Sequence, residues 1–179
     1  MKKIMTLIAV LALVLTAGTL PVTAADTDFK DVPDGAYYAD AVTWAVEEEI
    51  TQGTGNGVFS PERTVTRSEA VTFLWRAAGS PAPTTATSGF SDVTDKNAFY
   101  YKAVLWAVEK GITNGVGGGR FNLTATLTYD QIFTFLCRFA GEKAEGDNWS
   151  SAAVAWARNS GLTAGLTFTA QSNCPRSDV

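Results

Sequence analysis

The sequence predicts an all-α protein made of helix-loop-helix repeats. Apolar residues recur at helical spacing, capping signals stand before the apolar runs, and one segment of the chain occurs again further along. Residues 29–79 return as residues 90–141, and a third, shorter copy covers residues 149–179. Repetition of this length is typical of units that bury too little apolar surface alone and therefore pack on one another.

The first 25 residues have the pattern of a secretory signal. Lys2 and Lys3 precede an apolar stretch at 4–20, and small residues at 22–24 suit a signal peptidase. The alternative is a membrane anchor, but the proline and the cleavage-like site favour removal. We therefore expect residues 1–25 to be cleaved, with no membrane association afterwards.

Charge and composition limit the class of function. Without Lys2 and Lys3, 12 basic and 18 acidic residues give a net charge of −6. Such an acidic exported chain is a poor partner for nucleic acid or an anionic membrane surface. An anion must instead be held locally, by one or two arginines in a shaped pocket.

The residue types of the chain give little support for a catalytic site or a bound cofactor. The chain has no histidine, which removes His-based triads and most zinc sites, and we predict no cofactor, no metal and no catalytic residue. Acidic pairs remain for glycoside hydrolysis, although the visible carboxylates have the pattern of a solvated helix face. Cys137 and Cys174 either form a disulfide or remain buried thiols, and the sequence leaves both open.

The first repeat contains two predicted helices. Tyr38, Val42 and Val46 share one face of the first helix, and the second begins after Thr66. The apolar stripe of the second helix follows helical spacing: Ala70, Phe73, Leu74, Ala77 and Ala78. Gly79 stands where a helix C-terminal glycine belongs. The Pro/Thr-rich segment 80–89 is predicted to be an extended linker.

The second and third repeats differ in completeness. The second follows the first at an offset of 62 residues from the first helix onward. The third stops one turn into its expected second helix, so ring-like packing would leave an apolar gap. Trp44, Trp106 and Trp156 occupy one repeated position and are expected in the core. Asp31 and Asp92 are expected to hydrogen-bond within their own turns.

The segment Thr66-Arg67-Ser68-Glu69 combines a helix start with a misplaced charge. Thr66 and Glu69 form a predicted capping box, in which each side chain satisfies a backbone N–H of the other. A cation in the first turn opposes the helix dipole, so Arg67 needs another reason to be there. Free N–H groups and a guanidinium would suit a carboxylate or phosphate. Alternatively, Arg67 points into water or pairs with an acid.

The other repeats act as an internal control. The second has Tyr129 at the arginine position but keeps the cap, with Thr128 and Gln131 in place of Thr66 and Glu69. The third has Arg176 after a proline and so keeps the arginine without the hydroxyl cap. Because cap and arginine vary separately, we expect Arg67 and Arg176 to serve binding.

These motifs together resemble S-layer homology (SLH) domains. The resemblance rests on Phe-x-Asp-Val, a Trp-Ala helix, Gly-Ile-Thr-x-Gly, Phe-x-Pro, and Thr-Arg-Ser-Glu before a Phe-Leu helix. It implies a three-pronged pseudo-trimer around a central helical bundle, with the third repeat incomplete here. Its grooves would hold secondary cell-wall polysaccharide, linked to peptidoglycan, through a pyruvylated sugar. The implied ligand-binding residues are Arg67, Arg176, Thr66, Glu69, Ser68 and Tyr129.

The resemblance implies a non-catalytic module that attaches an exported protein to the bacterial cell wall. Within that site Tyr129 departs from the pattern, so its groove is either weak or stacks a sugar ring. Two alternatives stay open: the anchoring piece of a larger surface hydrolase, and a self-assembling S-layer structural protein. A catalytic or S-layer domain fused beyond Val179 would fit either.

Overall fold

The computed structural model describes residues 29–145 and 147–179. Its helices are α2 (Ala39–Glu47), α3 (Arg67–Ala77), α4 (Tyr101–Glu109), α5 (Tyr129–Phe139), α6 (Trp149–Asn159) and the 3-10 turn η1 (Arg176–Asp178). Extended pairing in these residues is confined to isolated bridges, so the all-α prediction is confirmed. None of the described helices is long and apolar enough to cross a membrane. The predicted signal at 1–25 lies outside the described residues.

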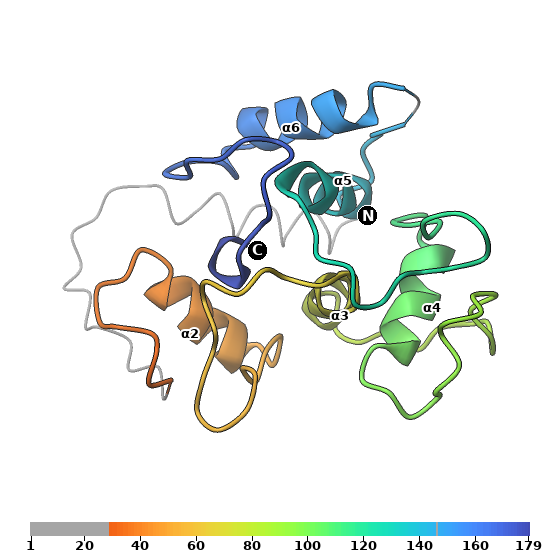
Figure 1. Cartoon of the computed structure of the whole chain (residues 1–179), viewed down its shortest axis with the longest axis horizontal. Helices are drawn as coiled ribbons and strands as arrows, with labels where there is room; N and C mark the ends of the chain where they lie inside the picture. The colour runs from red at the N-terminus through yellow and green to blue at the C-terminus, as the bar shows by residue number, and fades with distance from the viewer. Residues whose placement is uncertain (1–28, 146) are drawn as a thin grey trace.

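The helices are arranged as three outer and two inner elements. Figure 1 shows α2, α4 and α6 at the periphery, with α3 and α5 in the middle beside the C-terminal turn. Helix α4 packs on α3, and α6 packs on α5, while α3 and α5 also touch. The first helix of a repeat therefore packs on the second helix of the repeat before it.

Backbone hydrogen bonds link the segments that precede the second helices into a closed ring. The N–H of Val65 donates to Cys174 O at 3.0 Å, that of Cys174 donates to Leu127 O at 2.9 Å, and that of Leu127 returns to Val65 O at 3.0 Å. All three residues are fully buried. Because each buried amide is satisfied by another repeat, these segments hold the repeats together at the centre.

Apolar side chains form one large and one small core. The large core lies among α3 to α6, and the small one, under α2, contains Val32, Ala39, Val42 and Phe59. Trp106 is buried and packs edge-to-face on Phe139, whereas Trp156 is half-buried and Trp44 is 40% exposed. The expectation of three core tryptophans is therefore wrong for Trp44. Helix α4 packs on α3, whereas among the described elements no long helix packs on α2 in the same way.

The aspartates of the Phe-x-Asp-Val motifs reach further than expected. Asp31 accepts from the N–H groups of Phe59 and Ser60, both at 2.7 Å. Asp92 accepts in the same way from Phe121 and from the residue that follows it. The expectation of bonds within their own turns is wrong, because the loop before each second helix returns to these carboxylates. Each aspartate therefore fixes the loop that carries Phe59 or Phe121.

Both cysteines are buried thiols. Neither Cys137 nor Cys174 is paired in the structure. Burial raises the pKa of the Cys174 thiol to about 12, with the charge of Asp178 acting in the same direction. The neutral thiols behave as small apolar side chains of the core.

Candidate functional site

The predicted capping boxes begin both inner helices. The Thr66 N–H donates to Glu69 Oε2 at 3.0 Å, and the Glu69 N–H donates to Thr66 Oγ1 at 3.4 Å. At α5 the return bond from Thr128 N–H to Gln131 Oε1 is 3.2 Å long. These local interactions place residues 67 and 129 at the first position of their helices.

The next backbone donors of α3 are not available to a ligand. The Arg67 N–H donates to Ala125 O at 2.9 Å, and the Ser68 N–H donates to Leu123 O at 3.1 Å. Both residues are buried, and the Ser68 hydroxyl lies 3.2 Å from the Thr66 hydroxyl. The idea of free N–H groups that receive an anion is therefore wrong, because the second repeat supplies carbonyl oxygens to them.

The Arg67 side chain docks on the second repeat. Its Nε donates to Phe121 O at 2.8 Å and its Nη2 donates to Thr113 Oγ1 at 3.2 Å. The guanidinium carbon lies 4.9 Å from the ring centroid of Phe121 and 5.3 Å from that of Phe135. Burial lowers the pKa of Arg67, and the charge of Asp92 partly opposes this shift. The cation is thus held by a carbonyl, a hydroxyl and two aromatic faces.

Arg176 repeats this arrangement on the first repeat. Its Nε donates to Phe59 O at 2.9 Å, its Nη2 to Thr51 Oγ1 at 3.5 Å, and its carbon lies over the rings of Phe59 and Phe73 at 4.8 and 5.2 Å. One contact is new: Nη1 lies 3.0 Å from Glu69 Oε1. Burial lowers the pKa of Arg176, and Glu69 opposes this shift.

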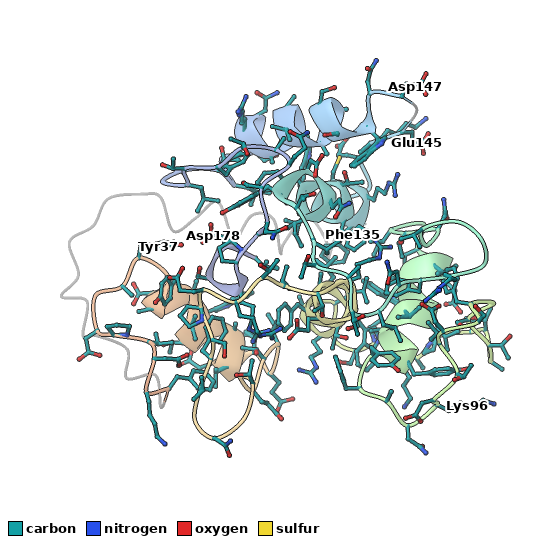
Figure 2. All side chains as sticks on the ribbon, viewed as in Figure 1. Tyr37, Lys96, Phe135, Glu145, Asp147 and Asp178 are labelled. Atoms are coloured by element: carbon teal, nitrogen blue, oxygen red, sulfur yellow. The ribbon has the colours of Figure 1, made fainter. Side chains whose placement is uncertain are left out.

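Tyr129 fills the same place between the second and third repeats. Its ring stacks on Phe168 with centroids 4.8 Å apart and planes 24° apart. Its hydroxyl donates to Asp178, which also accepts from the hydroxyl of Tyr37. Figure 2 shows Tyr37 and Asp178 side by side at the C-terminal turn. Burial raises the pKa of Tyr129, and its bond to Asp178 adds to this, so the phenol is a neutral donor.

The three junctions between repeats therefore differ in charge. The third residue of each repeat's second helix decides this charge. Glu69 of the first repeat pairs with Arg176, and Asp178 of the third repeat accepts from the hydroxyl of Tyr129. At the junction that receives Arg67, the equivalent residue is Gln131, which is neutral. Within the described residues no ion pair to Arg67 forms. The equivalent residues Arg67, Tyr129 and Arg176 therefore lie in three different electrostatic environments.

A cavity of about 350 Å³ lies at the junction that receives Arg176. Its lining contains Thr51, Gln52, Gly53, Thr54, Arg63, Glu69, Thr72, Phe73, Arg76, Phe99 and Arg176. We call this cavity the basic groove, because its lining contains three arginines and one carboxylate, that of Glu69. Its size lies in the range of small-molecule sites, about 300–1,000 Å³. Gly53 is required in its wall, since a Cβ would lie 2.5 Å from Val58 O and from a ring atom of Phe29.

Glu69 organises the charges of the groove. It accepts from both guanidinium nitrogens of Arg63, which is half-exposed, and pairs with the buried Arg176. Burial acts to raise the pKa of Glu69, but the bonds from Arg63 and Thr66 and the charge of Arg176 outweigh it. The pKa lies below its usual value, so Glu69 is ionised at neutral pH. The surplus charge of the groove is positive.

Sequence reasoning missed Arg63 and Arg76 as groove residues. Arg63 has no arginine counterpart, since Ala125 stands at its place in the second repeat, and that difference was the available signal. Arg76 donates from Nη1 to Ile50 O at 3.0 Å. Of the six predicted site residues, Arg176 and Glu69 line the groove, whereas the other four lie outside its lining.

The fold and groove define a protein of helical repeats whose junctions are closed by buried cations and rings. Known proteins identify the family. The S-layer homology domain profile matches residues 28–71 and 89–131, which cover most of the first two repeats. This chain belongs to the S-layer homology domain family.

Three relatives illustrate the range of these similarities. A cell surface protein of Thermoanaerobacter kivui is 32% identical over 183 residues, which cover 100% of this chain and 24% of the relative. The S-layer protein sap of Bacillus anthracis is 33% identical over 107 residues, or 59% of this chain and 13% of the relative. An endoglucanase of Bacillus sp. (strain KSM-635) is 26% identical over 145 residues, which cover 76% of this chain and 15% of the relative. The chain thus spans a quarter or less of each.

Proposed function

We propose that this chain is an exported, non-catalytic module that attaches a protein to the bacterial cell wall. The three repeats act as a three-pronged pseudo-trimer, and the module holds a secondary cell-wall polysaccharide without a covalent bond. Family membership and the surface-protein names of two relatives support the location at the cell surface. The observation that carries the proposal is the basic groove in a chain with a net charge of −4.

The groove suits a carboxylate such as that of a pyruvylated sugar. Arginine binds planar carboxylates through two parallel hydrogen bonds, and this geometry distinguishes them from neutral sugars. Arg63 is the most accessible guanidinium, with 42% of its side chain exposed, and Arg76 lines the same cavity. Arg176 is buried and already donates to protein groups, so it positions Glu69, and direct contact with the ligand is made by Arg63 and Arg76.

The remaining motif residues act through the scaffold. Thr66 and Ser68 shape the start of α3, and Arg67 and Tyr129 close the other two junctions. In this assignment Arg67 supports the ligand site indirectly. Tyr129 uses its ring on Phe168 and leaves no stacking role for a sugar at that junction.

Co-sedimentation with purified cell walls tests the proposal. The wild-type chain should pellet with intact walls, and it should stay in solution once the anionic polymer has been extracted. The double variant Arg63→Gln/Arg76→Gln should lose about tenfold or more in affinity, since charge-assisted bonds each contribute about 1.5–3 kcal/mol. Arg120→Gln, at an exposed arginine outside the groove, is the matched control. Equal binding to stripped walls would overturn the proposal.

Two broader settings fit the same module. The match to an endoglucanase favours attachment of a surface hydrolase whose catalytic part lies elsewhere. The match to an S-layer protein favours a subunit of a surface array. Release of reducing sugar by this chain alone would contradict the non-catalytic assignment. Concentration-dependent assembly without wall polymer, followed by light scattering, would indicate the structural role.

A further inference from the structure

The basic groove has walls from all three repeats, with Arg176 of the third repeat at its base and different chemistry on the other two walls. Arg63 and Arg76 belong to the first repeat, whereas Phe99 stands just before α4 in the second. Phe99 lines the same cavity and is 56% exposed. A large apolar side chain on a surface is informative when it lies in a concave site among polar groups.

We propose that Phe99 is a stacking platform for an uncharged sugar ring, next to the acidic sugar held by the arginines. This inference rests on the proposed function and deepens it. The ligand is then a stretch of at least two sugars, with its carboxylate toward Arg63 and Arg76 and the neighbouring ring on Phe99. Pyranose rings have a face of C–H groups, and an aromatic ring removes that face from water.

The geometry around Phe99 leaves its ring available. Its ring packs edge-to-face on Tyr100, with centroids 5.2 Å apart and planes 79° apart. In an edge-to-face pair, the edge of one ring lies against a single face of the other. The contact therefore orients both rings without covering all of their flat faces. At 56% exposure, Phe99 is the more open ring of the pair, because Tyr100 packs against the main core.

The first repeat offers an internal comparison. Tyr37 is equivalent to Phe99 and makes the same edge-to-face contact, with Tyr38, at 5.0 Å and 83°. There, however, the hydroxyl is bound to Asp178, so the residue ties the third repeat to the first. Phe99 has no hydroxyl and cannot make such a tie. At the basic groove the same position is therefore not tied to another repeat and is open to a ligand.

Polar groups of the loop at 51–54 complete the wall. Gln52 is exposed and lines the cavity, and its amide offers both a donor and an acceptor for sugar hydroxyls. Arginines, an amide and an aromatic ring together select an acidic oligosaccharide over a free small anion, which has no ring to cover Phe99.

Calorimetry with purified anionic wall polysaccharide, cut to short fragments, tests the inference. Phe99→Ala should weaken binding about tenfold, whereas Phe99→Trp should keep or increase the affinity, in line with a stacking gain of about 1.5 kcal/mol or less. Val116→Ala, at a residue 52% exposed in a turn of the second repeat, is the matched apolar control. Thermal unfolding of Phe99→Ala should match that of the wild type, because the side chain is mostly exposed.

The outcomes separate the two proposals. If Phe99→Ala binds within twofold of the wild type while Arg63→Gln/Arg76→Gln loses affinity, the platform is overturned and the anchoring function stands. If Phe99→Trp loses as much affinity as Phe99→Ala, stacking is also overturned. If the wild-type chain binds no fragment, the proposed function fails and the platform falls with it.

Discussion

The Nη1 of Arg176 lies 3.0 Å from Oε1 of Glu69, although the two residues stand 107 positions apart in the chain. This contact joins the third repeat to the first at the wall of the basic groove. Arg67, at the equivalent position in the first repeat, has the same kinds of carbonyl, hydroxyl and ring partners, but the sequence has Gln131 where the junction of Arg176 has Glu69. The comparison shows that the arginine can be held by the carbonyl, the hydroxyl and the rings without an ion pair.

Replacing Glu69 with glutamine tests the worth of that ion pair. Glu69→Gln keeps the capping box, because glutamine accepts the same bond, but leaves the Arg176 side chain, which is 1% exposed, without a counter-charge. We expect a loss of about 3 kcal/mol in the free energy of unfolding, measured by urea denaturation. The control Glu62→Gln, at an exposed neighbour, should change it by less than about 0.5 kcal/mol. Equal effects in both variants would contradict a specific pair.

Acid should weaken the fold through the same residue. The pKa of Glu69 in the folded protein lies below the usual 4.5, so its stabilising contribution is complete above that pH and is lost as the pH falls through the folded-state pKa. Asp92, whose pKa is also lowered, should add to this trend. Urea midpoints from pH 7 to pH 3 should stay level and then decline. The decline should be shallower in Glu69→Gln, and identical slopes would exclude Glu69 as a source.

A carboxylate at position 131 should improve the junction that receives Arg67. Gln131→Glu places an acid where Glu69 stands at the junction of Arg176, and glutamate also suits the capping box. A gain of about 1 kcal/mol is expected, seen as a rise of about 2–4 °C in Tm. Gln171→Glu, at an exposed glutamine, serves as the control and should leave Tm unchanged. An unchanged Tm in Gln131→Glu would show that position 131 does not reach the guanidinium.

The phenol of Tyr129 should matter for stability more than that of Tyr37. Tyr129→Phe keeps the stack on Phe168 but removes a buried hydroxyl from Asp178, at a cost of about 1–2 kcal/mol. Tyr37→Phe removes a bond to the same carboxylate from a residue that is 70% exposed, so its cost should be smaller. Urea denaturation of both variants checks the order. A larger loss in Tyr37→Phe would reverse our account of this junction.

Local chemistry made the helices predictable. The capping pair of Thr66 and Glu69 and the glycine after α3 act within a few residues, so their effect is visible in a single stretch of sequence. The offset of 62 also predicted equivalences that the structure bears out. Phe59 and Phe121 receive the two arginines in the same way.

The partners of the arginines depend on how the repeats close on one another. A guanidinium at a helix start looked available to a ligand, yet Arg67 is buried in the neighbouring repeat. No pattern within the first repeat predicts that Arg67 binds Phe121, which lies 54 residues further along the chain. Arg63 could not be predicted by comparing the repeats, because Ala125 stands at its place in the second repeat. Arg63 lines the groove together with repeated residues such as Arg76.

The ring of hydrogen bonds among Val65, Leu127 and Cys174 has a consequence for biogenesis. A nascent or translocating polypeptide cannot close it until Cys174 has emerged, so two buried partners wait for a segment made more than a hundred residues after the first. Such long-range closure is slow to form. During that interval the exposed backbone groups can pair with the matching segment of a second molecule, so we expect exchange of the C-terminal segment between copies to be the main route of misassembly.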